Sequence, residues 1–491
     1  MKKRLALLLI IAMTAGMLSA CGTKAPEKES ETTSTSSETE QSSDESKQAS
    51  DVTEDGEVTI VKYWNSASGE KAAMDENVEK FNSTIGKENN VRIELEHIES
   101  GDYDQQLSVA FQNGMEPDLV QIRPSNIAEY AEKGYIVPLD EVAGIKETVE
   151  KSNATQVEGE NAWDGKLYMI PIGARIIGLA YNKDMFVSAG IVDENGEAKP
   201  PATLEEMIEY AKRLTNPEKR QFGFCLPIGW GAFTEYYITS PSQSSSGMID
   251  GIYNYNTGEF DFEGMRDMAE ALLKMKEEGS IYPGAEGLDN DPARARFAEG
   301  EIGMMMTVQW DCAVWNDQFP AKCDWGVAPV PVADPDNAYM QCSHATYSYA
   351  IASRGTKDGR EDAIALAFNY FYGVEEIARR CERGMGIPWN PEIMEMCDFS
   401  NSPKGWDDFC KLREISIPVN CLTKSVDLDG MDKFNGDFIN KVWSGEQTLD
   451  EWILEMTIRY NEGAQRFIDN NSDVVAESMK GRVDPNLNFR R

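Results

Sequence analysis

The sequence predicts an α/β fold, in which helices cover a mainly parallel sheet. Strand-like and helix-like segments alternate as β-α-β-α-β between residues 58 and 122, an order typical of parallel sheets with covering helices. Amphipathic helical patterns continue from there to residue 470. With 491 residues, 41% of them hydrophobic, the chain has enough material for the cores of two or three domains.

The first strand is expected at Val58 to Trp64, a run rich in Val, Ile, Tyr and Trp. A helix with one apolar face follows it. Val91 to His97 then alternates strictly between one side of a sheet and the other, which predicts a strand. A second helix, at about Tyr103 to Asn113, leads through a Pro-Asp turn to a strand at Leu119 to Ile122.

A second group of helices begins with a capping box, in which Thr203 is followed three residues later by Glu206. A later helix is expected to end at Gly279, a residue type that favours helix C-termini. Its apolar stripe is Met265, Met268, Leu272 and Met275. A methionine stripe at this spacing indicates core packing rather than a ligand site. Further helices are expected at Asp362 to Tyr372 and Asp450 to Asn470.

The N-terminus has the three parts of an export signal. Basic residues precede an apolar run, Leu5 to Met17, that is too short to span a bilayer as a helix. Leu18 to Cys21 resembles the bacterial lipobox, which implies cleavage after residue 20 and a lipid on Cys21 that holds the protein on the extracellular face of the cell membrane. Gly22 to Gly56 is polar and acidic, and we expect a disordered tether. The alternative is an ordinary cleaved signal with an incidental cysteine.

Charge and histidine content exclude several classes of function. Asp and Glu number 84 against 47 Lys and Arg, for a net charge of −37, so nucleic acid is not an expected partner. Only two histidines occur, and no G-x-S-x-G or H-E-x-x-H motif is found, which argues against triad hydrolysis and histidine-metal chemistry. We expect no cofactor, no metal and no catalytic residue.

The cysteines leave two interpretations open. Apart from Cys21, the cysteines are Cys225, Cys312, Cys323, Cys342, Cys381, Cys397, Cys410 and Cys421. No C-x-x-C pair is found. An even number in an exported chain permits disulfides of unknown connectivity, and buried free thiols are the equal alternative.

Several sequence motifs occur in an order that is known from one family. The most specific is Gly165 to Asp184 (GKLYMIPIGARIIGLAYNKD), which matches a G-x-x-Y-x-x-P … YNKD pattern. The others are Val58 to Glu70, Gly114 to Asp118, Pro200 to Leu214 and Phe297 to Trp310, with weaker matches at Trp325 to Pro331, Gly384 to Pro388 and the last helix. The chain thereby resembles the extracellular solute-binding proteins of ABC importers, specifically the family 1 carbohydrate binders related to maltose-binding protein. Gly303, where many members carry alanine, is a minor departure.

The resemblance implies a periplasmic-binding-protein-like fold of two discontinuous α/β lobes with a ligand cleft between them. The N-terminal lobe would comprise residues 57–174 and 345–385, and the C-terminal lobe residues 175–344 and 386–491. The chain would cross between them near Ala174 to Leu179, Ala328 to Tyr347 and Gly384 to Trp389. The implied function is to capture a carbohydrate, such as an oligosaccharide, and to deliver it to the permease subunits of an ABC importer. The protein is expected to be a monomer.

Candidate ligand contacts are aromatic and polar residues at predicted strand ends and crossings. Sugars need aromatic platforms and short polar side chains, and ligands of open α/β sheets bind beyond the carboxyl ends of the strands. The leading candidate is Trp310, with Asp311 beside it, after a strand at Met304 to Val308. The other candidates are Trp64 and Asn65 at the end of the first strand, Glu70 in the loop that follows it, Arg123 after the third strand, Arg175 and His344 at crossings, Trp230 between two glycines, and Trp389 after the last crossing.

Structural roles remain open for some of these residues. Arg123 is equally suited to a surface ion pair, and a lone histidine such as His344 is more often structural than ligand-binding. Arg175 lies in an apolar segment, so its charge needs a partner or a ligand. Trp315 and Trp325 are expected in the core.

Two other functions are alternatives to carbohydrate binding. A secreted carbohydrate-active enzyme needs two carboxylates at a defined separation, and none of the 84 acidic residues is singled out by its context. A binding protein for a peptide, polyamine or sugar phosphate is the other alternative. Glu70 and Asp311 are compatible with a polyamine, and Arg123 with Arg175 is compatible with a phosphate.

Overall fold

The computed structural model describes residues 58–66, 71–123, 126–152, 154, 156–157, 159–171, 173–345, 348–419, 426–431, 433–470 and 488–491. All of them belong to one compact unit, residues 56–491. The predicted signal, the lipidated Cys21 and the tether to Gly56 lie outside the described residues. Within the described part, no helix has the length and apolar character needed to cross a membrane.

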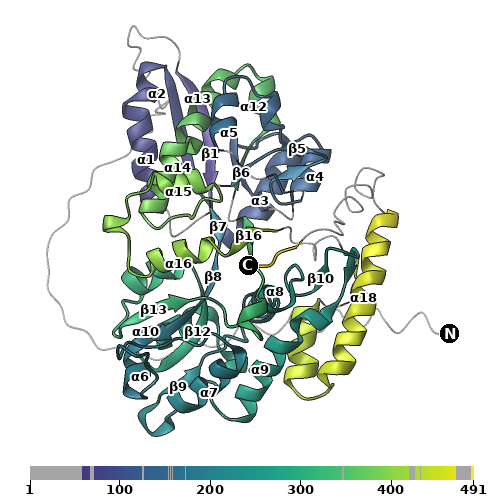
Figure 1. Cartoon of the computed structure of the whole chain (residues 1–491). Helices are drawn as coiled ribbons and strands as arrows, with labels where there is room; N and C mark the ends of the chain where they lie inside the picture. Colours follow the sequence, from purple (N-terminus) through teal and green to yellow (C-terminus); the bar gives the residue numbers. More distant parts are fainter. Residues whose placement is uncertain are drawn as a thin grey trace, which may run out of the picture. The chain divides into compact units, whose positions relative to one another are not determined.

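The first of two main sheets has five strands in the order β2-β1-β3-β15-β6, of which β1 and β6 are labelled in Figure 1. Its strands are β1 (Thr59–Asn65), β2 (Val91–His97), β3 (Leu119–Ile122), β6 (Ile170–Pro171) and β15 (Ser348–Ile351). β1 pairs in parallel with β2 and β3, and β15 runs antiparallel to β3. The predicted β-α-β-α-β order is therefore confirmed, and the late strand β15 inserts beside it from far along the chain.

Helices cover both faces of this sheet. One face packs against α1 (Lys71–Ser83), α13 (Glu361–Tyr372) and α14 (Val374–Glu382), and the other packs against α3 (Ser100–Asn113) and α4 (Ile127–Glu132). Alternation explains the two cores, because neighbouring strand residues point to opposite faces. Tyr349 and Ile351 lie in the first core and Ala350 in the second.

The second main sheet has four strands in the order β13-β8-β12-β9. Its strands are β8 (Ile177–Asn182), β9 (Phe222–Phe224), β12 (Ile302–Val308) and β13 (Trp325–Ala328). Every residue of β12 is buried, because α7 (Leu204–Leu214) and α9 (Arg266–Glu277) pack on one face while α10 (Asn290–Ala298) and α16 (Trp406–Arg413) pack on the other. The long helix α18 (Leu449–Asn470) adds Trp452 and Tyr460 to the first of these cores.

Shorter elements complete the fold. The helices are α2 (Ile85–Glu88), α5 (Lys146–Ser152), α6 (Lys183–Ser188), α8 (Ser240–Ser246), α11 (Asp311–Ala313), α12 (Ser353–Lys357), α15 (Pro391–Glu395) and α17 (Phe434–Asp437). The strand pairs are β4 (Ala162–Trp163) with β5 (Lys166–Leu167) and β10 (Tyr253–Asn254) with β11 (Glu259–Phe260).

A three-stranded sheet, β16-β14-β7, joins segments that run between the two main sheets. It contains β7 (Ala174–Arg175), β14 (Gln341–Ala345) and β16 (Ser416–Pro418). Ala174 pairs with Ala345, and its N–H also donates to the carbonyl of Ile387 at 2.7 Å. Three chain segments are therefore fastened to one another beside a single residue.

Local expectations from the sequence are confirmed at several points. Thr203 caps the helix as predicted, since its hydroxyl accepts from the Glu206 N–H at 3.0 Å, and the Glu206 carboxylate reaches back to accept from the Ala202 N–H at 2.8 Å. The stripe of Met265, Met268, Leu272 and Met275 is buried, as are Trp315 and Trp325.

The described cysteines are free thiols, namely Cys225, Cys312, Cys323, Cys342, Cys381, Cys397 and Cys410, and Cys421 lies outside the described residues.

Candidate ligand-binding site

The carboxyl ends of β1 and β3 form a fixed polar edge on the first sheet. The N–H and hydroxyl of Ser66 both donate to the Gln121 side-chain oxygen, at 2.8 and 2.6 Å. Asn65, only 1% exposed, accepts from the Tyr349 hydroxyl at 2.9 Å. The Asn65 amide is therefore held by the sheet itself. The half-buried Trp64 is the last residue but one of β1 and lies at the same end of the strand.

Trp64 and Arg123 are the candidates at this edge that keep exposed surface. The ring of Trp64 packs edge to face against Tyr103, with 6.4 Å between centroids. The Arg123 side chain is 39% exposed and pairs with Asp104 at 2.8 Å, the surface ion pair that was its structural alternative. Glu70 lies outside the described residues.

Three half-buried aromatic side chains, Trp230, Tyr236 and Trp310, meet beyond the carboxyl end of β12 in the second sheet. We call them the aromatic cluster. The centroids of Trp230 and Tyr236 are 4.7 Å apart, and those of Tyr236 and Trp310 are 6.2 Å apart. Trp310 comes two residues after the end of β12, and Tyr236 lies on a π-helical turn, Glu235–Thr239. Partly exposed aromatic faces in this arrangement suit the apolar face of a flat ligand.

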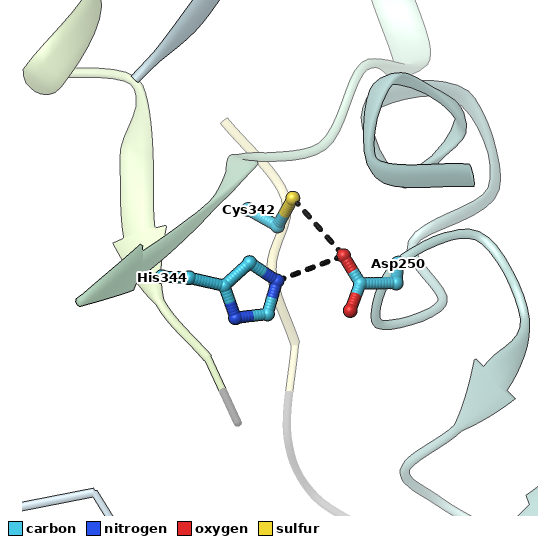
Figure 2. A group of neighbouring side chains, drawn as sticks. All are labelled: Asp250, Cys342 and His344. Atoms are coloured by element: carbon cyan, nitrogen blue, oxygen red, sulfur yellow. Dashed lines mark hydrogen bonds and ion pairs between the residues drawn. The ribbon is translucent and has the colours of Figure 1, made fainter. Parts of the chain in front are cut away.

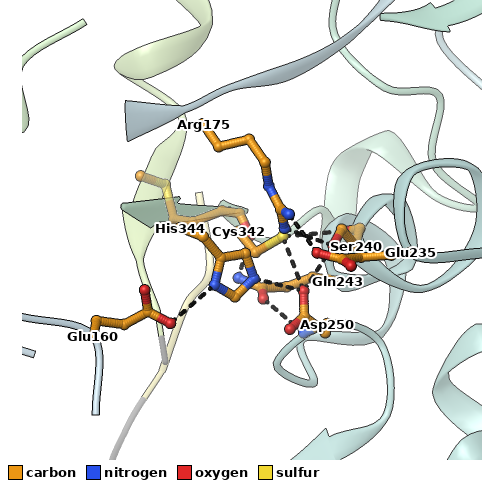
Figure 3. Close-up of polar contacts among 9 residues, drawn as sticks. Glu160, Arg175, Glu235, Ser240, Gln243, Asp250, Cys342 and His344 are labelled. Carbon is orange, nitrogen blue, oxygen red and sulfur yellow. Dashed lines mark hydrogen bonds and ion pairs between the residues drawn. The ribbon is translucent and has the colours of Figure 1, made fainter. Parts of the chain in front are cut away.

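Arg175 reaches the aromatic cluster from β7. Its guanidinium lies 4.7 Å from the ring centre of Tyr236, within the range of a cation–π contact. It also forms an ion pair with Glu235 and donates to the Ser240 hydroxyl at 3.2 Å (Figure 3). Burial raises the pKa of Glu235, but the charge and hydrogen bond of Arg175 outweigh burial and hold that pKa below its ordinary value. Arg175, whose buried charge was expected to need a partner, is therefore paired with Glu235.

A small pocket opens beside the aromatic cluster, with about 230 Å³ of space between its walls, open solvent included. It is lined by Trp230, Tyr236, Tyr237, Asn290, Arg294, Met306, Thr307, Val308 and Asp311. Aromatic walls with a few polar groups are typical of sites for small ligands.

Asp311 is fixed in the wall of this pocket. Its Oδ2 accepts from the Thr307 hydroxyl at 2.8 Å and from the Val308 N–H at 3.1 Å. Its Oδ1 lies 2.5 Å from Arg294 Nη2. The carboxylate is only 3% exposed, and these contacts hold it at a defined position, where it also orients Arg294.

His344 and Trp389 lie apart from the pocket lining. Trp389 is 5% exposed and packs in a core cluster with Trp406. The ring nitrogens of His344 face two carboxylates, Glu160 at 3.4 Å and Asp250 at 2.9 Å. Burial lowers the pKa of His344, but the charge of Asp250 outweighs burial and places the pKa well above the ordinary value of 6.5.

The structure thus gathers four predicted residues, Arg175, Trp230, Trp310 and Asp311, around one that was not among the candidates, Tyr236. Sequence reasoning also missed Glu235, Asn290 and Arg294 as neighbours of this site. Tyr236 follows Trp230 by six residues, and that spacing was a usable signal. Nothing in the local sequence links Arg294 to Asp311 or Glu235 to Arg175.

Residues 65–376 match the sequence model of the family described as bacterial extracellular solute-binding protein. The chain belongs to this family. Among curated relatives of this solute-binding protein, the maltotriose-binding protein of Pyrococcus abyssi is 24% identical over 315 residues, 63% of each chain. The multiple sugar-binding protein of Streptococcus mutans is 23% identical over 230 residues, 46% of this chain and 45% of that one. These alignments span less than two thirds of either relative.

Solved structures show the same fold. MalE from Bdellovibrio bacteriovorus, bound to maltotriose, superimposes with a TM-score of 0.60 at 19% identity, covering 84% of this chain and 100% of that one. The GacH receptor of Streptomyces glaucescens gives a TM-score of 0.63 at 16% identity with the same coverage. The expected periplasmic-binding-protein-like fold of two α/β lobes, each built on one of the main sheets, is therefore confirmed.

Proposed function

We propose that this solute-binding protein is a monomer that captures a carbohydrate, an oligosaccharide in particular, and delivers it to the permease subunits of an ABC importer. The observation that carries the proposal is the aromatic cluster beside a pocket with Asn290, Arg294 and Asp311 in its wall. Sugar rings have apolar C–H faces and hydroxyl edges, so they need both kinds of surface. The names of the relatives, which include binding proteins for maltotriose and multiple sugars, support the same class of ligand.

In this proposal one sugar ring stacks on the aromatic cluster while its hydroxyl groups reach the pocket wall. Asp311 accepts hydrogen bonds from the ligand, and Arg294 donates them through its forked guanidinium. Trp64, Asn65, Glu70 and Arg123 of the first lobe, together with Trp389, are proposed contacts for the other end of the ligand. We propose that the two lobes close around this ligand. One lobe would comprise residues 57–174 and 345–385, and the other residues 175–344 and 386–491.

We propose that the chain only binds its ligand and does not transform it. The carboxylates near the aromatic cluster are committed to basic partners, since Glu235 pairs with Arg175 and Asp311 pairs with Arg294. An acid–base pair for glycoside hydrolysis needs one carboxyl group that keeps its proton. The pKa of Glu235 is lowered, which disfavours its protonated form.

We further propose that a lipid on Cys21 anchors the protein to the extracellular face of the cell membrane. The three-part signal and the lipobox-like Leu18 to Cys21 support this assignment, and the polar segment to Gly56 would separate the folded body from the bilayer.

The test is calorimetric titration with maltotriose, a mixture of neutral oligosaccharides, spermidine, a tripeptide and glucose 6-phosphate. Saturable binding of a neutral oligosaccharide, without sugar products in chromatography after long incubation, is the expected result. Binding of spermidine, the peptide or the sugar phosphate alone would refute the carbohydrate assignment. Release of smaller sugars would refute the non-catalytic role.

A further inference from the structure

Asp250, Cys342 and His344 converge on one another (Figure 2), and Ser240 separates them from Arg175 and the aromatic cluster. Asp250 Oδ1 is 2.9 Å from His344 Nε2 and 3.5 Å from Cys342 Sγ. The three ligand atoms all lie within 4.8 Å of one another, and all three residues are buried. We propose that these residues form a binding site for a divalent cation of the zinc class.

The separations suit a tetrahedral ion. Zinc binds thiolate sulfur at about 2.3 Å, imidazole nitrogen at about 2.0 Å and carboxylate oxygen at about 2.0 to 2.2 Å. Ligand atoms of one tetrahedron are then roughly 3.3 to 3.5 Å apart. Two of the three separations, 2.9 and 3.5 Å, lie near this range, and the third, between the donors of Cys342 and His344, is within 4.8 Å. Small side-chain movements would therefore bring the three donors around one ion. A mixed sulfur, nitrogen and oxygen set favours zinc over magnesium or calcium, which prefer oxygen alone.

Neighbouring groups orient the donors as they do in known zinc sites. The second ring nitrogen of His344, Nδ1, faces Glu160 Oε1 at 3.4 Å, which gives the carboxylate–histidine–metal arrangement that fixes the ring. The Ser240 hydroxyl donates to Asp250 Oδ1 at 2.7 Å, and the Asp250 N–H donates to the Gln243 side-chain oxygen at 3.2 Å (Figure 3). Asp250 and His344 are therefore held in place from behind.

The charge of the surroundings favours a cation. Asp250 and Glu160 are carboxylates, and the nearest guanidinium, Arg175, already pairs with Glu235. A divalent ion bound by the thiolate of Cys342, the carboxylate of Asp250 and neutral His344 would leave a nearly neutral buried cluster.

The location links the ion to the junction of the lobes. His344 lies on β14, which pairs with β7, and Glu160 lies just before β4, whose Trp163 packs in the core of the first lobe. Asp250 lies between Ile249 and Ile252, which belong to a core of the second lobe. A bound ion would fasten the crossing strand to the second lobe and stabilise the junction.

Cobalt(II) is the direct probe, because a thiolate bound to it gives a charge-transfer absorption that carboxylates and imidazoles do not give. The full chain, stripped with a chelator and kept reduced, is titrated with Co²⁺ and then with Zn²⁺. We expect one Co²⁺ per chain with the thiolate band, displaced by Zn²⁺. Cys342→Ser should abolish the band, and Asp250→Asn should weaken Co²⁺ binding by at least about tenfold. Cys225→Ser, at a buried thiol outside the cluster, should keep both.

X-ray absorption of the zinc-loaded wild type tests the site without any variant, and one sulfur with two or more nitrogen or oxygen neighbours is expected. Absence of the thiolate band, its persistence in Cys342→Ser, its loss in Cys225→Ser, or a zinc shell without sulfur would overturn the proposal. None of these measurements involves a sugar, so their failure is separate from failure of the proposed function.

Discussion

The ring of Trp310 meets the ring of Tyr236 at 65°, with 6.2 Å between centroids. Trp310 follows a fully buried strand yet is itself only half-buried. Its side chain should therefore add little to the stability of the core. Trp310→Ala should weaken oligosaccharide binding by roughly thirty-fold, which corresponds to about 2 kcal/mol. The melting temperature without ligand should fall little. Calorimetric titration and an unliganded melt measure both quantities.

Trp325→Ala is the matched control for that variant. Trp325 is 2% exposed and packs edge to face on Trp315, so its loss should destabilise the protein by about 3 kcal/mol or more and leave the affinity of the folded fraction unchanged. Normal binding by Trp310→Ala, or a large drop in its unliganded Tm, would make Trp310 a structural residue.

Close packing at Gly223 gives a stability prediction that is independent of function. A Cβ at this position of β9 would lie 1.8 Å from the backbone oxygen of Ala211 on α7. Gly223→Ala must therefore push α7 away from the sheet, and we expect a loss of at least about 2 kcal/mol. At the exposed Gly436 of α17 a Cβ meets nothing within 4 Å, so Gly436→Ala should keep or raise the Tm. Equal stabilities of the two variants in chemical and thermal denaturation would contradict this packing.

The ion pair of Glu235 with Arg175 predicts a pH dependence of stability. The pKa of Glu235 lies below its ordinary value of 4.5, so the unfolded chain takes up this proton at a higher pH than the folded chain. The stabilisation is complete above the unfolded pKa and is lost as the pH falls through the folded one. Wild type should exceed Glu235→Gln in free energy of unfolding at pH 6 to 7, and the difference should shrink below about pH 4.5.

Urea unfolding at a series of pH values measures that difference. Glu209→Gln, at a 61% exposed carboxylate that pairs with Arg213 on the same helix, is the control and should change the free energy much less. A difference between wild type and Glu235→Gln that grows toward acid pH would have the wrong sign for this interpretation.

The lipobox-like sequence predicts that the lipid on Cys21 is the anchor. Cys21→Ala should release the protein from cells into the medium while its circular dichroism and Tm stay as in the wild type. Radiolabelled fatty acid should be incorporated into the wild type only. Incorporation into Cys21→Ala would assign the lipid to another residue.

Regular elements could be predicted from the sequence because their signals are local. Val91 to His97 alternates with the pleat, and it forms β2 as predicted. The methionine stripe of α9 and the two core tryptophans follow from helical spacing and from the apolar character of their surroundings. Trp310 could be placed at a strand end because the segment before it, Ile302 to Val308, is mainly apolar.

The assembly of the site depends on contacts that no local pattern encodes. Tyr236 meets Trp310 across 74 positions of sequence, and His344 meets Asp250 across 94. The π-helical turn Glu235–Thr239, which turns Tyr236 toward Arg175, has no simple sequence signature. Spacing rules for metals fail at Asp250, Cys342 and His344 for the same reason, because the ligands come from different parts of the chain.

The free thiols have a consequence for handling the protein in air. Burial raises the pKa of Cys225 and Cys312 far above the ordinary value and that of Cys323 to about 11, so hardly any reactive thiolate exists while the chain is folded. Unfolding exposes these groups together and restores their ordinary reactivity. Oxygen then links them at random, and the covalent products cannot return to the native state. Denaturation should therefore be reversible under a reductant and become a one-way process in an oxidising medium.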